Sequence, residues 1–348
     1  MSRAEAKLGF LLGLQEESGG AVPFDRWMRE ALYHPEFGYY TANIRGIGRG
    51  GDFTTWPLLH DSLARAVAAW AVAHRPARRW HLIEVGAGNG AFAEGVLRAI
   101  GWWNRPQYHI VDVSPVLRAQ QQARLKGKAV WHDSLPEALA ACGGEALIFS
   151  NELVDAFPCR IFQRQGAAWK ELALRIDGGR VEEVWIGGQP GNRTPQPDGP
   201  LPEAGGLGSV VFDYAWPDGQ RVEVQESFAG WLQGWMPGWK SGRMLTMDYG
   251  GFCPALYERR PQGSLRAYQH HQRIEGREAY KGFGVRDLTV DVNFSDVIRW
   301  TEAGGARTSR CVSLGEFLGS IPGQDDVLRA LRMPGGAGEA FQVLDQAR

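Results

Sequence analysis

Residues 80–92 read WHLIEVGAGNGAF, and this stretch predicts a buried strand, a glycine turn and the start of a helix. Leu82, Ile83 and Val85 supply the apolar run of the strand, and apolar residues at helical spacing follow the turn. Glycines allow a sharp turn, and they let a ligand lie against bare peptide N–H groups at the N-terminus of a helix. The stretch therefore predicts a pocket for a nucleotide-type ligand.

The glycine turn fits two classes of ligand. Gly86-x-Gly88-x-x-Ala91 matches the dinucleotide fingerprint, and Gly86-x-Gly88-x-Gly90 matches the turn that binds S-adenosylmethionine equally well. Glu84 favours the second ligand, because a carboxylate two residues before the turn would repel a pyrophosphate but suits a sulfonium and an ammonium group. A strand-end Glu84 in solvent is the simpler alternative.

Composition and charge narrow the class of protein. A length of 348 residues suits one large domain with insertions, or two domains. The formal net charge of -1 provides no overall basic field, so a nucleic-acid partner is not expected. No apolar run reaches roughly 18 residues, so no membrane span is expected either.

The cysteines and the first residues bear on compartment and on metal. The four cysteines lie far apart and none forms a C-x-x-C pair, so we expect neither a disulfide framework nor a zinc site. The first twenty residues mix Glu16 and Glu17 with leucines and lack a leader pattern. These features favour a cytoplasmic protein.

Acidic residues lie at the ends of the next two predicted strands. Residues 108–113 form the first of these strands, and Asp112 lies at about the distance from the glycine turn expected for a ribose-binding acid. Residues 129–132 form the second, and Asp133 after it could accept a hydrogen bond from an adenine amino group. Either acid could instead cap the helix that follows it.

Two polar residues follow another buried strand at residues 146–150. In an open α/β sheet, ligands bind beyond the carboxyl ends of the strands. Asn151 and Glu152 stand at that position, so we expect them to face the substrate. The simpler alternative is that they begin a helix.

The remaining chain departs from strict alternation of strand and helix. The pattern predicts a β-meander and a Gly/Pro-rich loop at residues 187–206. His270 and His271 are adjacent in a segment that reads as extended. Neighbouring residues on a strand face opposite ways, so this pair does not suit a metal site. The predicted helices span residues 4–17, 24–32, 63–72, 226–239 and 294–301. The predicted strands span residues 159–164, 168–176, 180–186, 243–247, 307–312 and 340–344.

Several motifs occur in a fixed order along the chain. They are LYHPEFGYY at residues 32–40, GDFTT at 51–55, EVGAGNG at 84–90, VSP at 113–115, NELVDA at 151–156, DYG at 248–250, GSLR at 263–266 and DVNF at 291–294. In this series the chain resembles the MidA-like methyltransferases, from about residue 22 to the C-terminus. That family includes a mitochondrial complex I assembly factor considered a protein arginine methyltransferase.

The resemblance implies an α/β fold of the class I methyltransferase type, with a Rossmann-like seven-stranded sheet and S-adenosyl-L-methionine as donor. It also implies an N-terminal helical region and an inserted β-meander. We expect four segments: residues 1–75 with the helical region and a cofactor-covering loop, 76–158 with the first part of the core, 159–206 with the meander and its loop, and 207–348 with the remainder of the core.

The resemblance and the residues together imply a set of site roles. Glu84 would bind the methionine ammonium, and Asp112 the ribose. If the acceptor is an arginine of a protein partner, Glu152 could hold its guanidinium group in a bidentate pair. The expected catalytic residues are Asn151 and Glu152. The expected cofactor-binding residues are Asp52, Phe53, Thr54, Thr55, Glu84, Gly86, Ala87, Gly88, Gly90, Asp112, Val113, Asp133 and Asn151, and no metal ligand is expected.

Two departures from the family pattern keep other functions open. The family usually has Ser-Pro-Glu where this chain has Trp56-Pro57-Leu58, and Phe-Gly-Glu where it has Leu63-Ala64-Arg65. One alternative is therefore a non-catalytic methyltransferase-fold protein that works as an assembly factor or binding module. A nicotinamide-dependent dehydrogenase is the second, and Glu84 argues against it.

Overall fold

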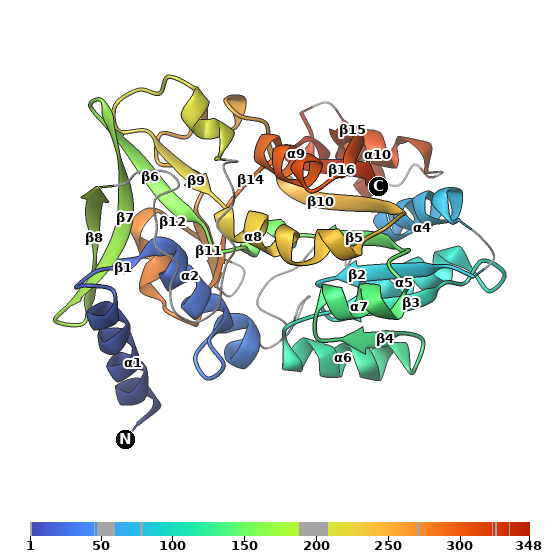
Figure 1. Ribbon diagram of the computed structural model, residues 1–348, viewed down its shortest axis with the longest axis horizontal. Helices are drawn as coiled ribbons and strands as arrows, with labels where there is room; N and C mark the ends of the chain where they lie inside the picture. Colours follow the sequence, from blue (N-terminus) through green and yellow to red (C-terminus); the bar gives the residue numbers. More distant parts are fainter. Residues whose placement is uncertain are drawn as a thin grey trace. The chain divides into compact units, whose positions relative to one another are not determined.

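The computed structural model describes residues 2–44, 46, 60–76, 79–187, 208–269, 272–321, 323, 326–333 and 335–348 (Figure 1). The chain divides into two units. Unit 1 comprises Met1–Ile44, Ala156–Trp231 and Phe252–Asp291, and unit 2 comprises Arg45–Asp155, Leu232–Gly251 and Val292–Arg348.

These units divide the chain differently from the four expected segments. The predicted N-terminal helical region is split, because α1 (Arg3–Glu17) and α2 (Phe24–Tyr33) belong to unit 1 whereas α4 (Ser62–His74) belongs to unit 2. Residues 208–231 and 252–291 join the β-meander in unit 1 and not the core sheet. The division depends on contacts between segments distant in the chain, which the order of elements in the sequence does not reveal.

Unit 2 alternates strands and helices over most of its length (Figure 1). Its further strands are β2 (His81–Val85), β3 (Gln107–Val111), β4 (Val130–His132), β5 (Leu147–Asn151), β10 (Arg243–Gly251), β14 (Val292–Asn293), β15 (Arg307–Ser313) and β16 (Phe341–Ala347). Its further helices are α5 (Ala91–Ile100), α6 (Pro115–Leu125), α7 (Leu135–Ala141), α9 (Phe294–Ala303), α10 (Leu314–Phe317) and α11 (Asp326–Arg332), and α8 (Glu226–Trp235) contributes residues to both units.

The predicted α/β class is confirmed by the sheet of unit 2. Seven strands lie in the order β15-β16-β10-β5-β2-β3-β4, in which β16 runs antiparallel to both neighbours and the other pairs are parallel. Among the described residues an eighth, short strand adds to the seven expected, because Gly250 and Gly251 of β10 pair with β14. The strand predicted over residues 243–247 therefore extends past Asp248, to Gly251.

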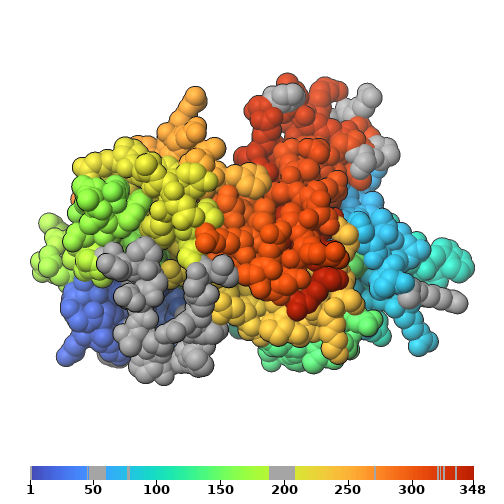
Figure 2. Space-filling view, turned by 45° about the horizontal axis from the view of Figure 1, so that its top comes forward, coloured from blue at the N-terminus to red at the C-terminus, as the bar shows by residue number. Residues whose placement is uncertain are grey.

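One face of this sheet packs against α4 and α5. Leu82, Tyr108 and Phe149 of three neighbouring strands belong to a buried cluster that includes apolar residues of both helices. A Cβ atom built on Gly95 of α5 would lie 2.9 Å from the Cβ of Ala64 on α4, so the two helices approach closely. The departure Leu63-Ala64 from the family pattern therefore lies in the core. In Figure 2 the orange and red C-terminal residues of unit 2 lie against the blue residues of α4.

Unit 1 contains the predicted β-meander. Strands β6 (Arg160–Gln165), β7 (Ala168–Asp177) and β8 (Arg180–Gly187) pair in succession, and β1 (Val22–Pro23) and β9 (Arg221–Val224) extend this sheet. Strands β11 (Arg266–Gln269), β12 (Gln272–Glu275) and β13 (Asp287–Thr289) form a second sheet. The helix predicted over residues 24–32 is confirmed as α2, and its buried residues are Phe24, Trp27, Met28, Ala31 and Leu32.

Candidate functional site

The glycine turn joins β2 to α5 at the carboxyl end of the sheet. Gly86, Gly88 and Gly90 have φ angles of 74°, 53° and 80°, a region that residues with a Cβ atom rarely adopt. The N–H of Gly86 donates to Val111 O at 2.9 Å, and that of Gly90 donates to Ala87 O at 2.9 Å. The turn is therefore held by its own backbone and by β3.

The turn lies beside the segment that follows β5. A Cβ atom built on Gly86 would lie 3.1 Å from Leu153 Cδ1, and β2 and β5 are neighbouring parallel strands. A Cβ atom built on Gly90 would lie 3.1 Å from the Cα of Gln121 on α6. The structure thus brings the predicted cofactor turn and the predicted acceptor segment together.

Glu84 is buried, with 1% of its surface exposed. The alternative that its side chain lies in solvent at the end of the strand is therefore wrong. The hydroxyl of Tyr108 donates to Glu84 Oε2 at 2.6 Å. The pKa of Glu84 is raised to about 8, mainly because the carboxyl is buried; the hydrogen bond from Tyr108 lowers it and the nearby charge of Asp112 raises it. A cation placed at this carboxyl would therefore gain a strong partner, as the ammonium of a methionine group requires.

Asp112 is a buried carboxylate directly after β3. Its Oδ1 accepts from the N–H of Ser114 at 2.9 Å and its Oδ2 accepts from Gln121 Nε2 at 2.7 Å, and the backbone of Ala87 also donates to it. An ionised carboxylate has about four acceptor positions, so about one remains for a ribose hydroxyl. Ser114 is the N-cap of α6, which removes capping as the role of Asp112.

Val113 and Asp133 are exposed residues that directly follow Asp112 and β4 along the chain. Val113 is 61% exposed, so it offers an apolar surface next to the Asp112 residue that it follows. The exposed carboxylate of Asp133 forms an ion pair with Arg118 of α6. Ser134 caps α7, so Asp133 is not a helix cap either.

Gln121 is the residue of this site that the sequence pattern did not indicate. It is fully buried, and its Nε2 donates to Gly88 O at 2.8 Å as well as to Asp112, while its Oε1 accepts from Trp131 Nε1 at 2.9 Å. This one side chain therefore ties the glycine turn, the acid after β3 and strand β4 together. Its only sequence signal is its place two turns into α6.

We expect Gln121→Glu to weaken binding of S-adenosylmethionine by about tenfold or more, because the lost donor removes one buried hydrogen bond from Gly88 O and one from Asp112. The new carboxylate would also repel Asp112. Calorimetric titration measures the effect, and adenosine, which lacks the methionine end, should lose affinity to a similar degree. Gln122→Glu, an exposed change on the same helix, is the control. Unchanged adenosine affinity in Gln121→Glu would contradict the role.

Asn151 and Glu152 do not begin an α-helix. Glu152 has a φ angle of 52°, an uncommon conformation for a residue with a side chain, and Asn151 Nδ2 donates to Glu152 Oε1 at 3.1 Å. A single helical turn follows at Val154–Ala156. Strained backbone of this kind gathers at functional sites, so Glu152 is a candidate functional residue.

Asp248 of β10 holds the segment after Glu152 in place. Its fully buried Oδ2 accepts from the N–H groups of Leu153, Val154 and Asp155 at 3.2, 2.8 and 3.2 Å. Burial raises the pKa of Asp248, and the charges of Asp155 and Glu152 raise it further, although the N–H donors oppose this. Three carboxyl groups therefore crowd the carboxyl ends of β5 and β10, and a cation there would relieve their repulsion.

The side chains that the structure describes fit S-adenosylmethionine. A glycine turn with three positive φ angles, a buried acid suited to an ammonium group and a second acid with acceptor capacity for a ribose all lie within unit 2. Several predicted residues lie outside the described ranges: Asp52, Phe53, Thr54 and Thr55 of the covering loop, Trp56 and Leu58 of the departure, and His270 and His271.

Known proteins resemble the chain over most of its length. Residues 62–312 match the family described as "Putative S-adenosyl-L-methionine-dependent methyltransferase". A protein from Burkholderia thailandensis, whose crystal structure has S-adenosyl-homocysteine bound, is 27% identical with a TM-score of 0.80, over 99% of this chain and 92% of that one.

Curated relatives give the same family and correct one expectation. The mitochondrial protein arginine methyltransferase NDUFAF7 of Xenopus tropicalis is 27% identical, over 84% of this chain and 70% of its own length. Its Drosophila melanogaster homologue is 26% identical, over 93% and 77%. The expected cytoplasmic location is therefore wrong on this comparison, because these relatives are mitochondrial by name. The composition of the first twenty residues, on which that expectation depended, does not identify a compartment.

The donor and the reaction class follow from these matches. The predicted cofactor, S-adenosyl-L-methionine, is confirmed by the family and by the bound product of the donor in the Burkholderia protein. Among the described residues, no helix is both long enough and apolar enough to cross a membrane. The chain belongs to the family of S-adenosyl-L-methionine-dependent methyltransferases.

Proposed function

We propose that this methyltransferase transfers its methyl group to an arginine side chain of a protein partner. The observation that carries the proposal is the strained Glu152, whose segment contacts the glycine turn through Leu153 and Gly86. The two relatives from Xenopus tropicalis and Drosophila melanogaster, which are named protein arginine methyltransferases, support it.

On the cofactor side, each residue would make one kind of contact. Glu84 would pair with the methionine ammonium, and Asp112 would accept from one ribose hydroxyl. Val113 would cover the adenine ring, and Asp133 would accept from its amino group while it keeps Arg118 as a partner. The N–H groups around Gly86, Ala87, Gly88 and Gly90 would lie against the cofactor, and the loop with Asp52, Phe53, Thr54 and Thr55 would cover the methionine end.

On the acceptor side, the crowded carboxyl groups favour a cation. Glu152 would hold the guanidinium group by two parallel hydrogen bonds, and Asn151 would fix the Glu152 carboxylate through its amide. S-adenosylmethionine supplies an activated methyl group, which passes to a guanidinium nitrogen as its C–S bond breaks, and S-adenosylhomocysteine and one proton leave. The protein would contribute mainly position and orientation, which suffice for a large acceleration.

The test is methyl transfer to protein from labelled S-adenosylmethionine. A protein extract from cells grown with methylation blocked serves as the acceptor mixture, and acid hydrolysis identifies the labelled amino acid. We expect labelled methylarginine with the wild type and about 10²-fold less, or none, with Glu152→Gln. Label in another amino acid, or in small molecules alone, would overturn the arginine proposal and leave the methyltransferase assignment intact.

A non-catalytic role is the remaining alternative. Calorimetric titration with S-adenosylmethionine, with NADH as the control ligand, separates the two functions. Micromolar binding corresponds to about −8 kcal/mol. Tight binding of S-adenosylmethionine without methyl transfer to any fraction of the extract would favour an assembly factor or binding module over an enzyme acting on arginine.

A further inference from the structure

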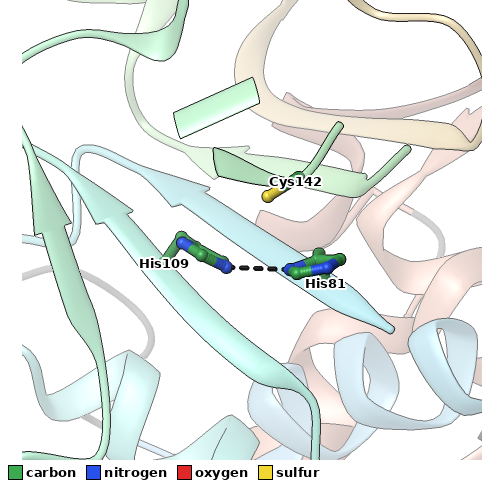
Figure 3. A group of neighbouring side chains, drawn as sticks. All are labelled: His81, His109 and Cys142. Atoms are coloured by element: carbon green, nitrogen blue, oxygen red, sulfur yellow. Dashed lines mark hydrogen bonds between the residues drawn. The ribbon is translucent and has the colours of Figure 1, made fainter. Parts of the chain in front are cut away.

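Two histidines and a cysteine of unit 2 come together at the other end of β2. His81 is the first residue of β2, His109 lies on β3, and Cys142 follows α7. His81 Nδ1 lies 3.0 Å from His109 Nε2, and one atom of each residue that can bind a metal lies within 4.8 Å of the others. In Figure 3 the sulfur of Cys142 points toward the two rings.

A hydrogen bond between two rings fixes the orientation of His109. His132 Nε2 lies 2.9 Å from His109 Nδ1. A histidine that binds a metal through Nε2 carries its ring proton on Nδ1, so a metal-bound His109 would donate that proton to His132 Nε2. The lone pair of His109 would then stand on Nε2, directed toward His81.

This arrangement is the one found around metal-binding histidines. Such a histidine donates its other ring N–H to a fixed acceptor, which sets its tautomer and orientation. With Zn–N bonds of about 2.0–2.1 Å, tetrahedral coordination needs nitrogens about 3.3 Å apart, close to the separation of the two histidines.

We propose that His81 Nδ1, His109 Nε2 and Cys142 Sγ form a binding site for Zn²⁺. Imidazole and thiolate ligands suit this borderline cation, and hard cations such as Mg²⁺ would not compete. The thiol of Cys142 loses its proton on binding. A water molecule can complete the coordination, because His81 is only half-buried.

The site is separate from the cofactor turn. His81 and Glu84 project from opposite faces of β2, and about 16 Å of chain separates His81 from Gly86, where the turn begins. A metal at this position would join β2, β3 and the end of α7. We therefore expect it to stabilise the sheet of unit 2. The sequence alone gives no sign of the site, because 28 and 33 residues separate the three ligands and only the parallel strands bring them together.

The test uses Co²⁺ as a spectroscopic probe on the metal-free full-length protein. We expect one equivalent to bind, with a near-ultraviolet thiolate-to-cobalt charge-transfer band that Zn²⁺ removes. The band should vanish in Cys142→Ser and persist in Cys311→Ser, a matched change of another cysteine of unit 2. It should also persist when His270 and His271 are both changed to Ala.

A second variant keeps the proposal testable if Cys142→Ser does not fold. His132→Ala leaves all three ligands but removes the acceptor that orients His109, so the band should remain while affinity falls about 10–100-fold. Zn²⁺ should raise the Tm of the wild type more than that of His132→Ala. Absence of the charge-transfer band in the wild type, or its persistence in Cys142→Ser, would overturn the proposal.

Discussion

Glu152→Gln is expected to reduce methyl transfer by about 10²-fold or more while changing the affinity for S-adenosylmethionine by less than about threefold. The substitution keeps the shape of the side chain and removes the charge that would hold a guanidinium group. It leaves the glycine turn, Glu84 and Asp112 untouched. Labelled methyl transfer and calorimetric titration measure the two quantities on the same preparation.

Glu152→Gly tests whether the residue serves the fold or the reaction. At a φ angle of 52° a glycine relieves strain of about 1 kcal/mol, and loss of the charge also removes repulsion of Asp248. We expect this variant to be at least as stable as the wild type by denaturant unfolding, yet inactive. Glu94→Gln, a surface carboxylate of α5 paired with Arg124, should change neither property. A clear loss of stability in Glu152→Gly would show a structural role.

The sequence was sufficient for the parts of the fold that depend on local pattern. The glycine turn, the acids at the ends of β3 and β4, and the helix predicted over residues 294–301 follow from spacing and residue type, and the structure has each element there. The Trp-rich helix predicted to reach residue 239 ends at Trp235, because Pro237 cannot continue it. Local rules of this kind need no knowledge of tertiary contacts.

The remaining features depend on contacts between distant segments. Gln121 has an ordinary place on a helix, and its role appears only when α6 packs against the glycine turn. Asp248 was visible as part of a motif, but its three N–H partners lie 93 to 95 residues earlier in the chain. The His81, His109 and Cys142 cluster and the division into two units have the same origin. Neither spacing nor composition carries such information.

Glu84→Gln is expected to weaken S-adenosylmethionine binding and, in the absence of cofactor, to stabilise the protein above neutral pH. The folded-state pKa of Glu84, about 8, lies above its ordinary value of 4.5. The contribution of protonated Glu84 to the free energy of unfolding is therefore fully present below pH 4.5. As pH rises through about 8 the protein loses this contribution, which amounts to up to roughly 5 kcal/mol. A neutral glutamine does not ionise, so the variant should lack this decline in thermal unfolding between pH 5 and 8.

The cofactor should reverse the preference of Glu84 for its protonated form. An ammonium group favours the carboxylate, so binding below pH 8 requires loss of one proton from Glu84, and affinity should rise by up to about tenfold per pH unit until pH 8 and then level off. Calorimetry at pH 7 in buffers of different ionisation enthalpy should detect the released proton. Glu84→Gln should release no proton on binding, and its free energy of binding S-adenosylmethionine should be weaker by about 1.5–3 kcal/mol. Affinity that is independent of pH between 6 and 8 would place the ammonium away from Glu84. On this proposal the same buried carboxyl would lower the stability of the free protein and strengthen its complex, which would account for an acid at this position in the core.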